Sequence, residues 1–309
     1  MIRRPSRSTP FPYTTLFRSA QSLIGAKAAW SALLLTALNA YLLLHGRRAM
    51  SEGLLFLNIT FFAWALFTWK KHPWLLAIPT ALAFSAKYSS IPLILIGLIS
   101  MVWPISQRPW HLRILDSVRF SILSGLIIFI LHPIFWSDPL HAIPAALQAR
   151  QDLIANQVSA LAAIQPDQIL NTPIERMTAL IIQLFLAPLA IADVGNYLAQ
   201  TQLSANAYLA NPLNTLLRSL TGGGILLGLT IIGPLLSSIR QIRQRTLVRP
   251  VLLSGMALVL QTAFLVTTVP LPFQRYAMPL LPRCILFQSL AIEQLIERFL
   301  PQKQKQPLN

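Results

Sequence analysis

The chain has 309 residues, of which 54% are hydrophobic and 11% are charged, and its formal net charge is +16. Soluble domains carry roughly 25% charged residues, so the composition excludes an ordinary soluble protein and indicates an integral membrane protein. The positive charge does not indicate nucleic-acid binding, because the basic residues fall in short gaps between apolar runs, as topology signals do. The single cysteine, Cys284, excludes an internal disulfide and a multi-cysteine metal site.

Apolar runs recur along the whole chain. A helix of about 17–25 apolar residues crosses a bilayer hydrocarbon core of roughly 30 Å. We therefore predict an all-α polytopic membrane protein, a helical bundle with about eight transmembrane helices and a long external loop.

Residues 1–19 stand apart from this pattern. They lack the apolar segment of a signal peptide, and Phe11–Ser19 reads like translated sequencing-adapter DNA. We interpret residues 1–19 as an adapter artefact, and the predicted fold therefore does not include them. On this interpretation we expect that natural sequence before Ala20 is missing.

The first apolar helix is predicted at residues 21–44, and a polar notch, His45–Glu52, follows it. A second helix, Gly53–Trp69, stops at Lys70–Pro73, whose two lysines favour the cytoplasmic side. Glu52 then lies on the outer face. Two interpretations stay open: the carboxylate stabilises the helix N-terminus, or it lines a site at the membrane surface.

The run Trp74–Trp103 is too long for one upright crossing, since thirty residues of helix measure about 45 Å. A single helix would bring Lys87 near the bilayer centre, at a cost of roughly 2.5–3.5 kcal/mol. A hairpin of two short helices puts Lys87 at an outer turn and keeps the flanking basic segments inside. We favour the hairpin.

The next predicted helix, Leu115–Phe135, crosses outward and ends at the interface with Trp136 and Asp138. The tryptophan suits an interface, and the acid suits a helix N-cap. These five transmembrane helices make up residues 20–135 of the predicted bundle.

Residues 136–221 are predicted to form an external loop. The loop carries more than half of the chain's nine acids, and Pro139–Ala163 and Pro173–Ala192 are helix-like. Ala179–Ala192 is short for a span, and if it crossed the membrane alone, the basic run Arg240–Arg245 would lie outside. We therefore expect one loop segment to lie on the membrane surface or to dip into it.

Three further spans are predicted within residues 222–299. They are Gly222–Ile239, Pro250–Val269 and Leu280–Phe299, with the external turn Pro270–Tyr276 before the last of them. A cytoplasmic tail, residues 300–309, ends the chain.

This topology gathers cations, acids and aromatic residues on the outer face. They are Glu52 with Arg47 and Arg48, Lys87 with Tyr88, Trp136 with Asp138, and Arg275 with Tyr276. Arginine and lysine suit a lipid phosphate, and a nearby acid suits general-base chemistry. Taken singly, each residue is also explained as a snorkelling or capping group. The chain has no Gly-rich phosphate loop, HExxH, CxxC or GxSxG motif.

Four segments resemble one family. Arg47–Phe56 resembles the Arg-to-Asp segment that opens a transmembrane helix in the dolichyl-phosphate-mannose protein mannosyltransferase superfamily, which includes glycosyltransferase family 39 and the aminoarabinose transferases. Ala83–Tyr88 resembles that family's step of small residues before Thr-Lys. His132–Pro139 and Gln274–Pro282 resemble later segments of its bacterial members, so the resemblance runs from Trp30 to Pro282.

The resemblance implies a multi-pass glycosyltransferase of the GT-C class in the inner (plasma) membrane. Such enzymes transfer a sugar from a polyprenyl-phosphate donor to an acceptor on the external, periplasmic side. It implies Glu52 as catalytic acid residue, at a position usually held by Asp, while the family's principal acid lies upstream of this chain. It also implies that six residues bind the lipid phosphate: Arg47, Arg48, Lys87, Tyr88, Arg275 and Tyr276. For Trp136 and Asp138 it implies either acceptor binding or a structural role. Some relatives hold a divalent metal, and the sequence assigns no ligand for one.

Two alternatives stay open. A lipid-linked sugar transporter or flippase would also gather cations near a lipid phosphate, but it should show paired halves or broken helices near the midplane, and none is apparent in the sequence. A non-catalytic membrane protein would carry the outer cations incidentally.

Overall fold

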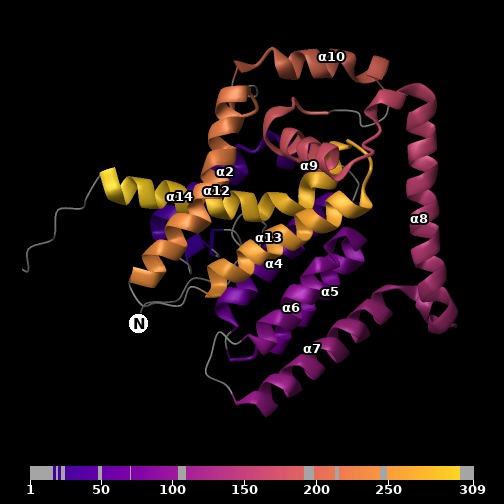
Figure 1. Cartoon of the computed structure of the whole chain (residues 1–309), viewed down its shortest axis with the longest axis vertical. Coiled ribbons are helices and arrows are strands. Elements are labelled where there is room, and N and C mark those ends of the chain that lie inside the picture. Colours follow the sequence, from indigo (N-terminus) through magenta and orange to yellow (C-terminus); the bar gives the residue numbers. More distant parts are fainter. Residues whose placement is uncertain are drawn as a thin grey trace, which may run out of the picture.

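The structure is a computed structural model, and it describes residues 17–18, 20–21, 25–47, 51–69, 71–103, 109–190, 198–212, 216–243 and 249–299. All regular secondary structure in these residues is helical, which confirms the predicted all-helical class (Figure 1). Most of residues 1–19, the notch residue Arg48 and the tail 300–309 lie outside the described residues.

The helices follow one another along the chain with short connections. The first group is α2 (Ala26–Ala37), α3 (Ala40–Arg47), α4 (Glu52–Thr68), η1 (Pro73–Leu76), α5 (Ala77–Ala86), η2 (Tyr88–Ser90), α6 (Pro92–Val102) and α7 (Trp110–Leu131). The second group is η3 (Pro133–Phe135), α8 (Pro139–Ile164), η4 (Pro166–Gln168), α9 (Pro173–Ile181), the π-helical η5 (Ile182–Leu186) and α10 (Leu198–Leu209). The third group is α12 (Leu220–Arg243), α13 (Arg249–Thr268), η7 (Gln274–Leu280) and α14 (Leu281–Phe299).

The predicted single helix over residues 21–44 is wrong, because the chain bends there. Helices α2 and α3 meet at an angle of 59°, with Leu38 and Asn39 between them. The Asn39 Oδ1 atom accepts the backbone N–H of Leu42 at 3.0 Å. Asparagine is a favoured N-cap because its side chain satisfies an N–H that the helix leaves free, so Asn39 starts a new helix in the middle of the apolar run.

The predicted hairpin at Lys87 is confirmed as a fold-back of two helices. Lys87 has an extended backbone (φ −164°, ψ 131°) that ends α5. Pro92 then begins α6, where the missing N–H of proline costs no helical hydrogen bond. η1 precedes α5 and packs against α6, which a single straight helix would place far beyond contact at about 1.5 Å per residue.

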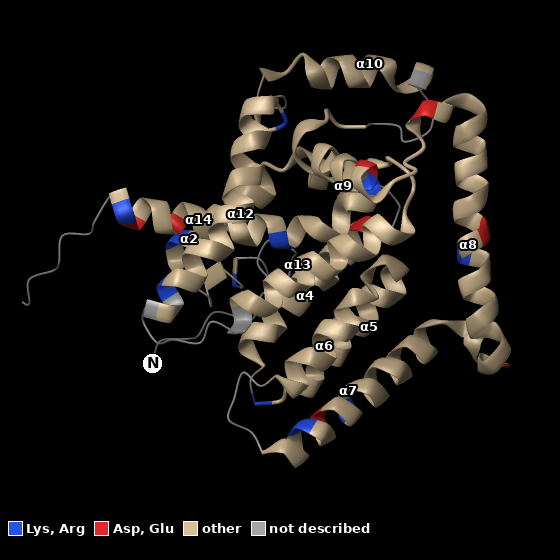
Figure 2. Ribbon diagram, viewed as in Figure 1, with Lys and Arg blue, Asp and Glu red and all other residues tan. Residues whose placement is uncertain are grey.

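Among the described residues, three helices are long and apolar enough to cross a membrane, over Trp110–Leu131 (α7), Leu220–Arg240 (α12) and Val251–Thr268 (α13). The bent pair α2 and α3 makes a fourth if it is one span. Long stretches of α12 and α13 carry no charged residue (Figure 2). The predicted count of eight stays a prediction, because α4, α5 and α6 are shorter, and charged residues interrupt α14.

Helix α14 runs through the centre of the molecule between α2 and α12 (Figure 1). Its Phe287 and Leu290 are fully buried in the main apolar cluster. A Cβ atom on Gly233 of α12 would lie 2.0 Å from the Phe287 carbonyl oxygen, so only glycine permits this close approach. The tight packing fixes the start of α14, and with it the η7 segment that reaches the candidate site.

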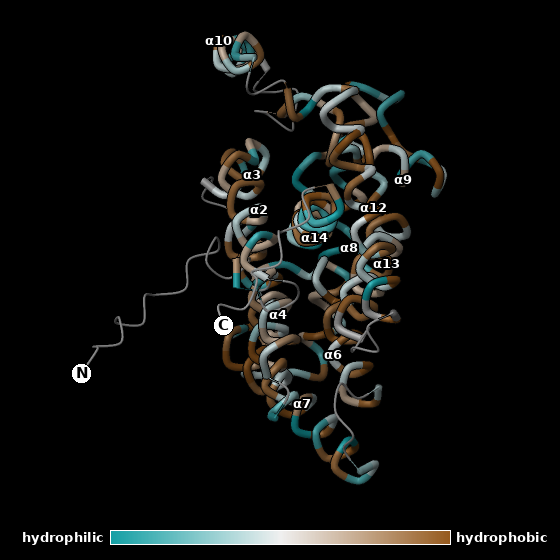
Figure 3. Tube along the Cα trace, turned by 90° about the vertical axis from the view of Figure 1, so that its left-hand side faces the viewer, coloured by the Kyte–Doolittle hydropathy of each residue, from teal (hydrophilic) through white to brown (hydrophobic). Residues whose placement is uncertain are grey.

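The predicted external loop is largely helical and lies at the margin of the molecule. Helix α8 has no buried residue and stands along one side (Figure 1), and α10 lies at one end (Figure 3). The Leu170 N–H donates to the Pro270 carbonyl at 3.1 Å. The Arg176 guanidinium donates to the Val266 carbonyl at 3.1 Å, so the α9 region is fastened to the end of α13.

Candidate functional site

An ion pair joins two helical segments that are 35 residues apart in the sequence. Lys87 Nζ lies 2.8 Å from Glu52 Oε1. The side chain of Glu52 is 4% exposed and that of Lys87 is 15% exposed. Both interpretations of Glu52 are compatible with this geometry, because it is the first residue of α4 and its side chain also reaches the hairpin turn.

A third segment, η7, closes over this pair. The Tyr276 ring lies below Lys87, with Nζ 5.2 Å from the ring centroid. The Arg275 guanidinium carbon lies 5.6 Å from the same centroid. These are cation–π distances, so one aromatic ring holds two cations close together.

Helix α8 contributes two residues to the surroundings of Lys87 and Tyr276, and the sequence did not indicate either of them as a site residue. The Tyr276 hydroxyl donates to Gln157 Oε1 at 2.8 Å. Arg150, seven residues earlier on the same helix, is close enough for its charge to act on Lys87. Nothing in the sequence marks Gln157, because its partner is 119 residues away.

The cluster of Glu52, Lys87, Arg150, Arg275 and Tyr276, which we call the cation cluster, has an excess of positive charge. The charge of Arg275 acts on both Glu52 and Lys87, and the charge of Arg150 acts on Lys87, so the ion pair lies in a positively charged environment. The Glu52 Oε2 atom is buried and has no hydrogen-bond partner among the described residues. A buried carboxylate oxygen without a donor is costly, and the cluster therefore offers an unused acceptor beside cations that suit an anion.

Tyr88 takes part in an aromatic group, and its predicted phosphate-binding role stays a prediction. Its ring centroid lies 5.0 Å from that of Phe84 and 6.4 Å from that of His132 at the end of α7. Tyr88 therefore packs the hairpin turn against α7.

Trp136 and Asp138 form local hydrogen bonds at the corner between α7 and α8. Trp136 Nε1 donates to the Phe129 carbonyl at 2.8 Å, and the residue is 57% exposed. The Asp138 carboxylate accepts a hydrogen bond from the backbone N–H of His141 at 3.3 Å. It also lies 2.6 Å from the ring atom Nδ1 of His141. The predicted capping role of Asp138 is confirmed, and the acceptor-binding role of both residues stays a prediction.

The two arginines of the notch add no described contact to the cation cluster. Arg47 is the last residue of α3, and only its backbone is described, while Arg48 lies outside the described residues. The predicted phosphate-binding role of both residues stays a prediction.

The hydrogen bonds of Gln274 hold the segment that carries Arg275 and Tyr276 in place. Gln274, the neighbour of Arg275, accepts the Ala190 N–H at 3.0 Å and donates to the Pro188 carbonyl at 3.1 Å. The Tyr41 hydroxyl of α3 donates to the Gln274 carbonyl. Gln274 thus ties α3 and the segment after η5 to the start of η7.

Arg218 holds η5 and the residue after it in place through hydrogen bonds. It donates to the carbonyls of Gln183, Leu184 and Ala187 at 2.6, 3.2 and 2.8 Å, which caps the C-terminal end of η5. Its burial lowers the pKa of the guanidinium, and the nearby Tyr41 and Tyr208 oppose this effect. Sequence analysis did not indicate Arg218.

Among the described residues, no group of three or more His, Cys, Asp or Glu side chains could hold a metal ion. Comparisons of the chain with models of protein families, with curated proteins and with solved structures find no match. The arrangement of the cation cluster therefore carries the functional argument.

Proposed function

We propose that the chain is a membrane glycosyltransferase that takes a sugar from a polyprenyl-phosphate donor and transfers it to an acceptor on the outer side of the plasma membrane. The observation that supports the proposal is that three residues from distant segments lie close together. Glu52, Lys87 and Tyr276 belong to three separate segments that resemble one family of such enzymes, and they meet at contact distance.

The residues suit the chemistry of this reaction. A sugar on a lipid phosphate leaves when the bond between its anomeric carbon and the phosphate oxygen breaks, and the electron pair stays on the phosphate. Lys87 and Arg275 would hold that negative charge. Glu52 Oε2, which has no donor of its own among the described residues, would accept the proton of the acceptor hydroxyl as that oxygen forms the new bond.

The test is sugar transfer by the purified chain in proteoliposomes, with a panel of polyprenyl-phosphate hexoses and pentoses. We expect Glu52→Gln to lower kcat by about 10²–10⁴-fold, the range of general-base catalysis. Lys87→Met should raise KM as well, because it removes a charge that holds the phosphate. Glu293→Gln is the matched control, since Glu293 is also a buried acid but bonds Ala28 of α2, and its transfer rate should stay unchanged.

Two outcomes contradict the proposal. One is that neither this chain nor the full-length product of its gene transfers sugar from any donor in the panel. The other is that Glu52→Gln retains full transfer, which would remove the acid from the reaction.

One observation favours a transporter or flippase as second candidate. The bend of 59° between α2 and α3 makes a broken apolar helix, a feature of many transporter binding sites. Fluorescent polyprenyl-phosphate lipids in the same proteoliposomes distinguish the two candidates. Movement of the lipid to the opposite leaflet without any sugar transfer would favour the transporter.

A further inference from the structure

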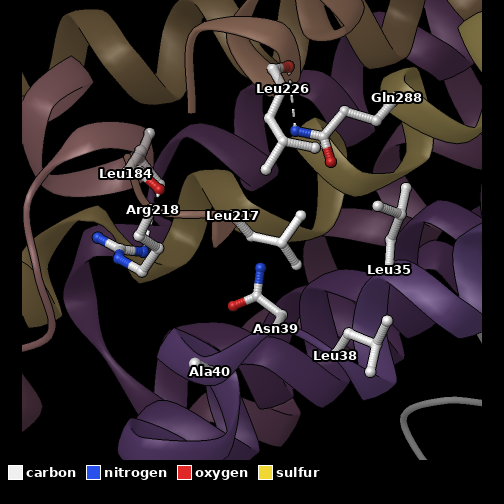
Figure 4. A pocket seen from close by; sticks show the side chains of 9 residues that line it. All are labelled: Leu35, Leu38, Asn39, Ala40, Leu184, Leu217, Arg218, Leu226 and Gln288. Atoms are coloured by element: carbon white, nitrogen blue, oxygen red, sulfur yellow. Dashed lines mark hydrogen bonds between the residues drawn. The ribbon is translucent and has the colours of Figure 1, made fainter. Parts of the chain in front are cut away.

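A pocket lies where α2 bends into α3, apart from the cation cluster. Figure 4 shows its lining, which comes from the α2 and α3 bend, from η5, from the residues before α12, and from α12 and α14. The empty space inside it and in front of its mouth together measures about 450 Å³, which includes open solvent, and about 30 Å³ of it admits the centre of a water-sized sphere. Leucine side chains make up most of the wall, and the polar exceptions are Asn39, Arg218 and Gln288.

An exposed apolar surface adjoins the pocket at Leu38. Leu38 lines the pocket and is 55% exposed. Trp30 and Leu34, which precede it at intervals of four residues on α2, are 63% and 59% exposed. Residues four apart lie on one face of a helix, so an exposed apolar stripe leads along α2 to Leu38. Exposed apolar patches of this kind mark a surface that another apolar molecule covers.

The walls indicate which apolar molecule this is. The α12 helix is a candidate membrane span, and the bent pair α2 and α3 is a further one if it counts as a single span. If both cross the membrane, a pocket between them would be open to the hydrocarbon chains of the bilayer. An acyl chain fits a leucine-lined wall, because it gains burial without leaving a polar group unsatisfied.

Arg218 adds a charge to this apolar pocket. The residue is 9% exposed, and no carboxylate among the described residues lies within ion-pair distance of it. Three of its five N–H groups donate to carbonyls of η5 and of Ala187, the residue after it. Two N–H donors remain, and the buried positive charge faces the Tyr41 ring at 5.4 Å but no carboxylate of the described residues. A phosphate group matches the donors and the charge.

We infer that this pocket binds an anionic phospholipid of the bilayer, with one acyl chain against the leucine wall and the phosphate at Arg218. The inference does not rest on the proposed glycosyltransferase activity. No residue that lines the pocket belongs to the cation cluster, so a lipid here would not occupy Lys87 or Arg275.

The test uses the full chain, purified in a non-ionic detergent and freed of lipid. Equal amounts of phosphatidylglycerol and phosphatidylcholine with identical acyl chains are added, and the lipids that stay bound are counted by native mass spectrometry. We expect one phosphatidylglycerol per chain, preferred over phosphatidylcholine by about tenfold, as one charge-assisted contact allows.

Two alanines of the bent pair give matched variants. Ala40 lines the pocket, so Ala40→Phe should fill it and lower lipid retention about tenfold. Ala37 is exposed and does not line it, so Ala37→Phe should retain the lipid as the wild type does. Arg218→Gln should reduce the preference for phosphatidylglycerol to less than about twofold, and its Tm shows whether η5 has stayed in place.

Equal retention by Ala40→Phe and Ala37→Phe would overturn the inference, whatever Arg218→Gln does, because the lipid would then adhere to the apolar surface. Farnesyl phosphate serves as a competing prenyl ligand. If it displaced phosphatidylglycerol at an equal concentration, the pocket would belong to a prenyl phosphate and the assignment to a phospholipid would be wrong.

Discussion

The cation cluster and the helices of the external loop use polar side chains in opposite ways. In the cluster, Glu52 pairs with Lys87 across 35 residues, and Tyr276 bonds Gln157 across 119. In the loop, Asp138 bonds His141 only three residues away, and Glu175 bonds Thr172 at the same separation. Local bonds complete a helix end, whereas distant bonds require the whole fold, and they leave Glu52 with an unused oxygen.

This difference in partner distance is not visible in the sequence, where both regions show the same pattern. Each has an acid next to an apolar helix start. The structure separates them by the position of the partner: Asp138 is satisfied at its own N-cap, while Glu52 is directed to another element. Variants of each region should therefore differ in the size of their effect.

The largest effect is expected from the removal of one partner of the buried pair. Lys87→Met leaves the Glu52 carboxylate buried without its cation, which should lower the free energy of unfolding by about 3–5 kcal/mol. Thermal unfolding in detergent micelles measures the change. The double variant Glu52→Gln, Lys87→Met should recover a large part of it, since the uncompensated charge is gone.

Arg119→Met is the control for this prediction. Arg119 approaches Asp116 at 3.9 Å, but its side chain is 52% exposed, so the loss should stay below about 1 kcal/mol. An equal loss for Arg119→Met and Lys87→Met would mean that burial of the Glu52 pair has no special energetic consequence.

A smaller effect is expected in the loop. Asp138→Ala removes the N-cap of α8 and should cost about 1 kcal/mol. Hydrogen exchange followed by mass spectrometry should show the loss in the first turn of α8 and leave the hairpin turn at Lys87 unchanged. Asp152→Ala, an exposed acid within α8, is the control. Faster exchange at Lys87 in Asp138→Ala would contradict the separation of the two regions.

The smallest effect is a pH dependence of α9. Hydrogen bonds from the backbone N–H groups of Thr172 and Asn171 lower the pKa of Glu175 from its ordinary 4.5. The stabilisation is therefore fully present above the unfolded value of about 4.5, and it is lost as the pH falls through the lower folded value. Glu175→Gln should lower Tm slightly at pH 6 and leave Tm unchanged at a pH below the folded value. A constant difference across this range would contradict the linkage.

Much of the local structure was predictable from residues that act on their own neighbours. The helices over residues 139–163 and 250–269 and the break at Lys87 follow from apolar runs, prolines and caps, and the structure bears them out. The bend at Asn39 was missed because the apolar run continues past it. Asparagine inside such a run gives no sign of whether it will cap a new helix.

The candidate site was predictable only in part. The sequence indicated Glu52, Lys87, Arg275 and Tyr276 by type and topology, and the structure brings these four together. It places Tyr88, Trp136 and Asp138 in local packing and capping roles. Arg150 and Gln157 were missed, because an exposed helix shows in its sequence which faces are polar but not which element it approaches.

The sequence by itself determined the helical class, the apolar character and the acids and cations available for a site. These depend on composition and on contacts between near neighbours, which the order of residues specifies directly. Only the tertiary structure decided which polar groups meet. Packing of α14 between α2 and α12 sets the position of η7, and η7 in turn brings Tyr276 against Lys87 at 5.2 Å. Such contacts arise from the sum of many weak packing interactions between distant segments, and no short stretch of sequence contains them.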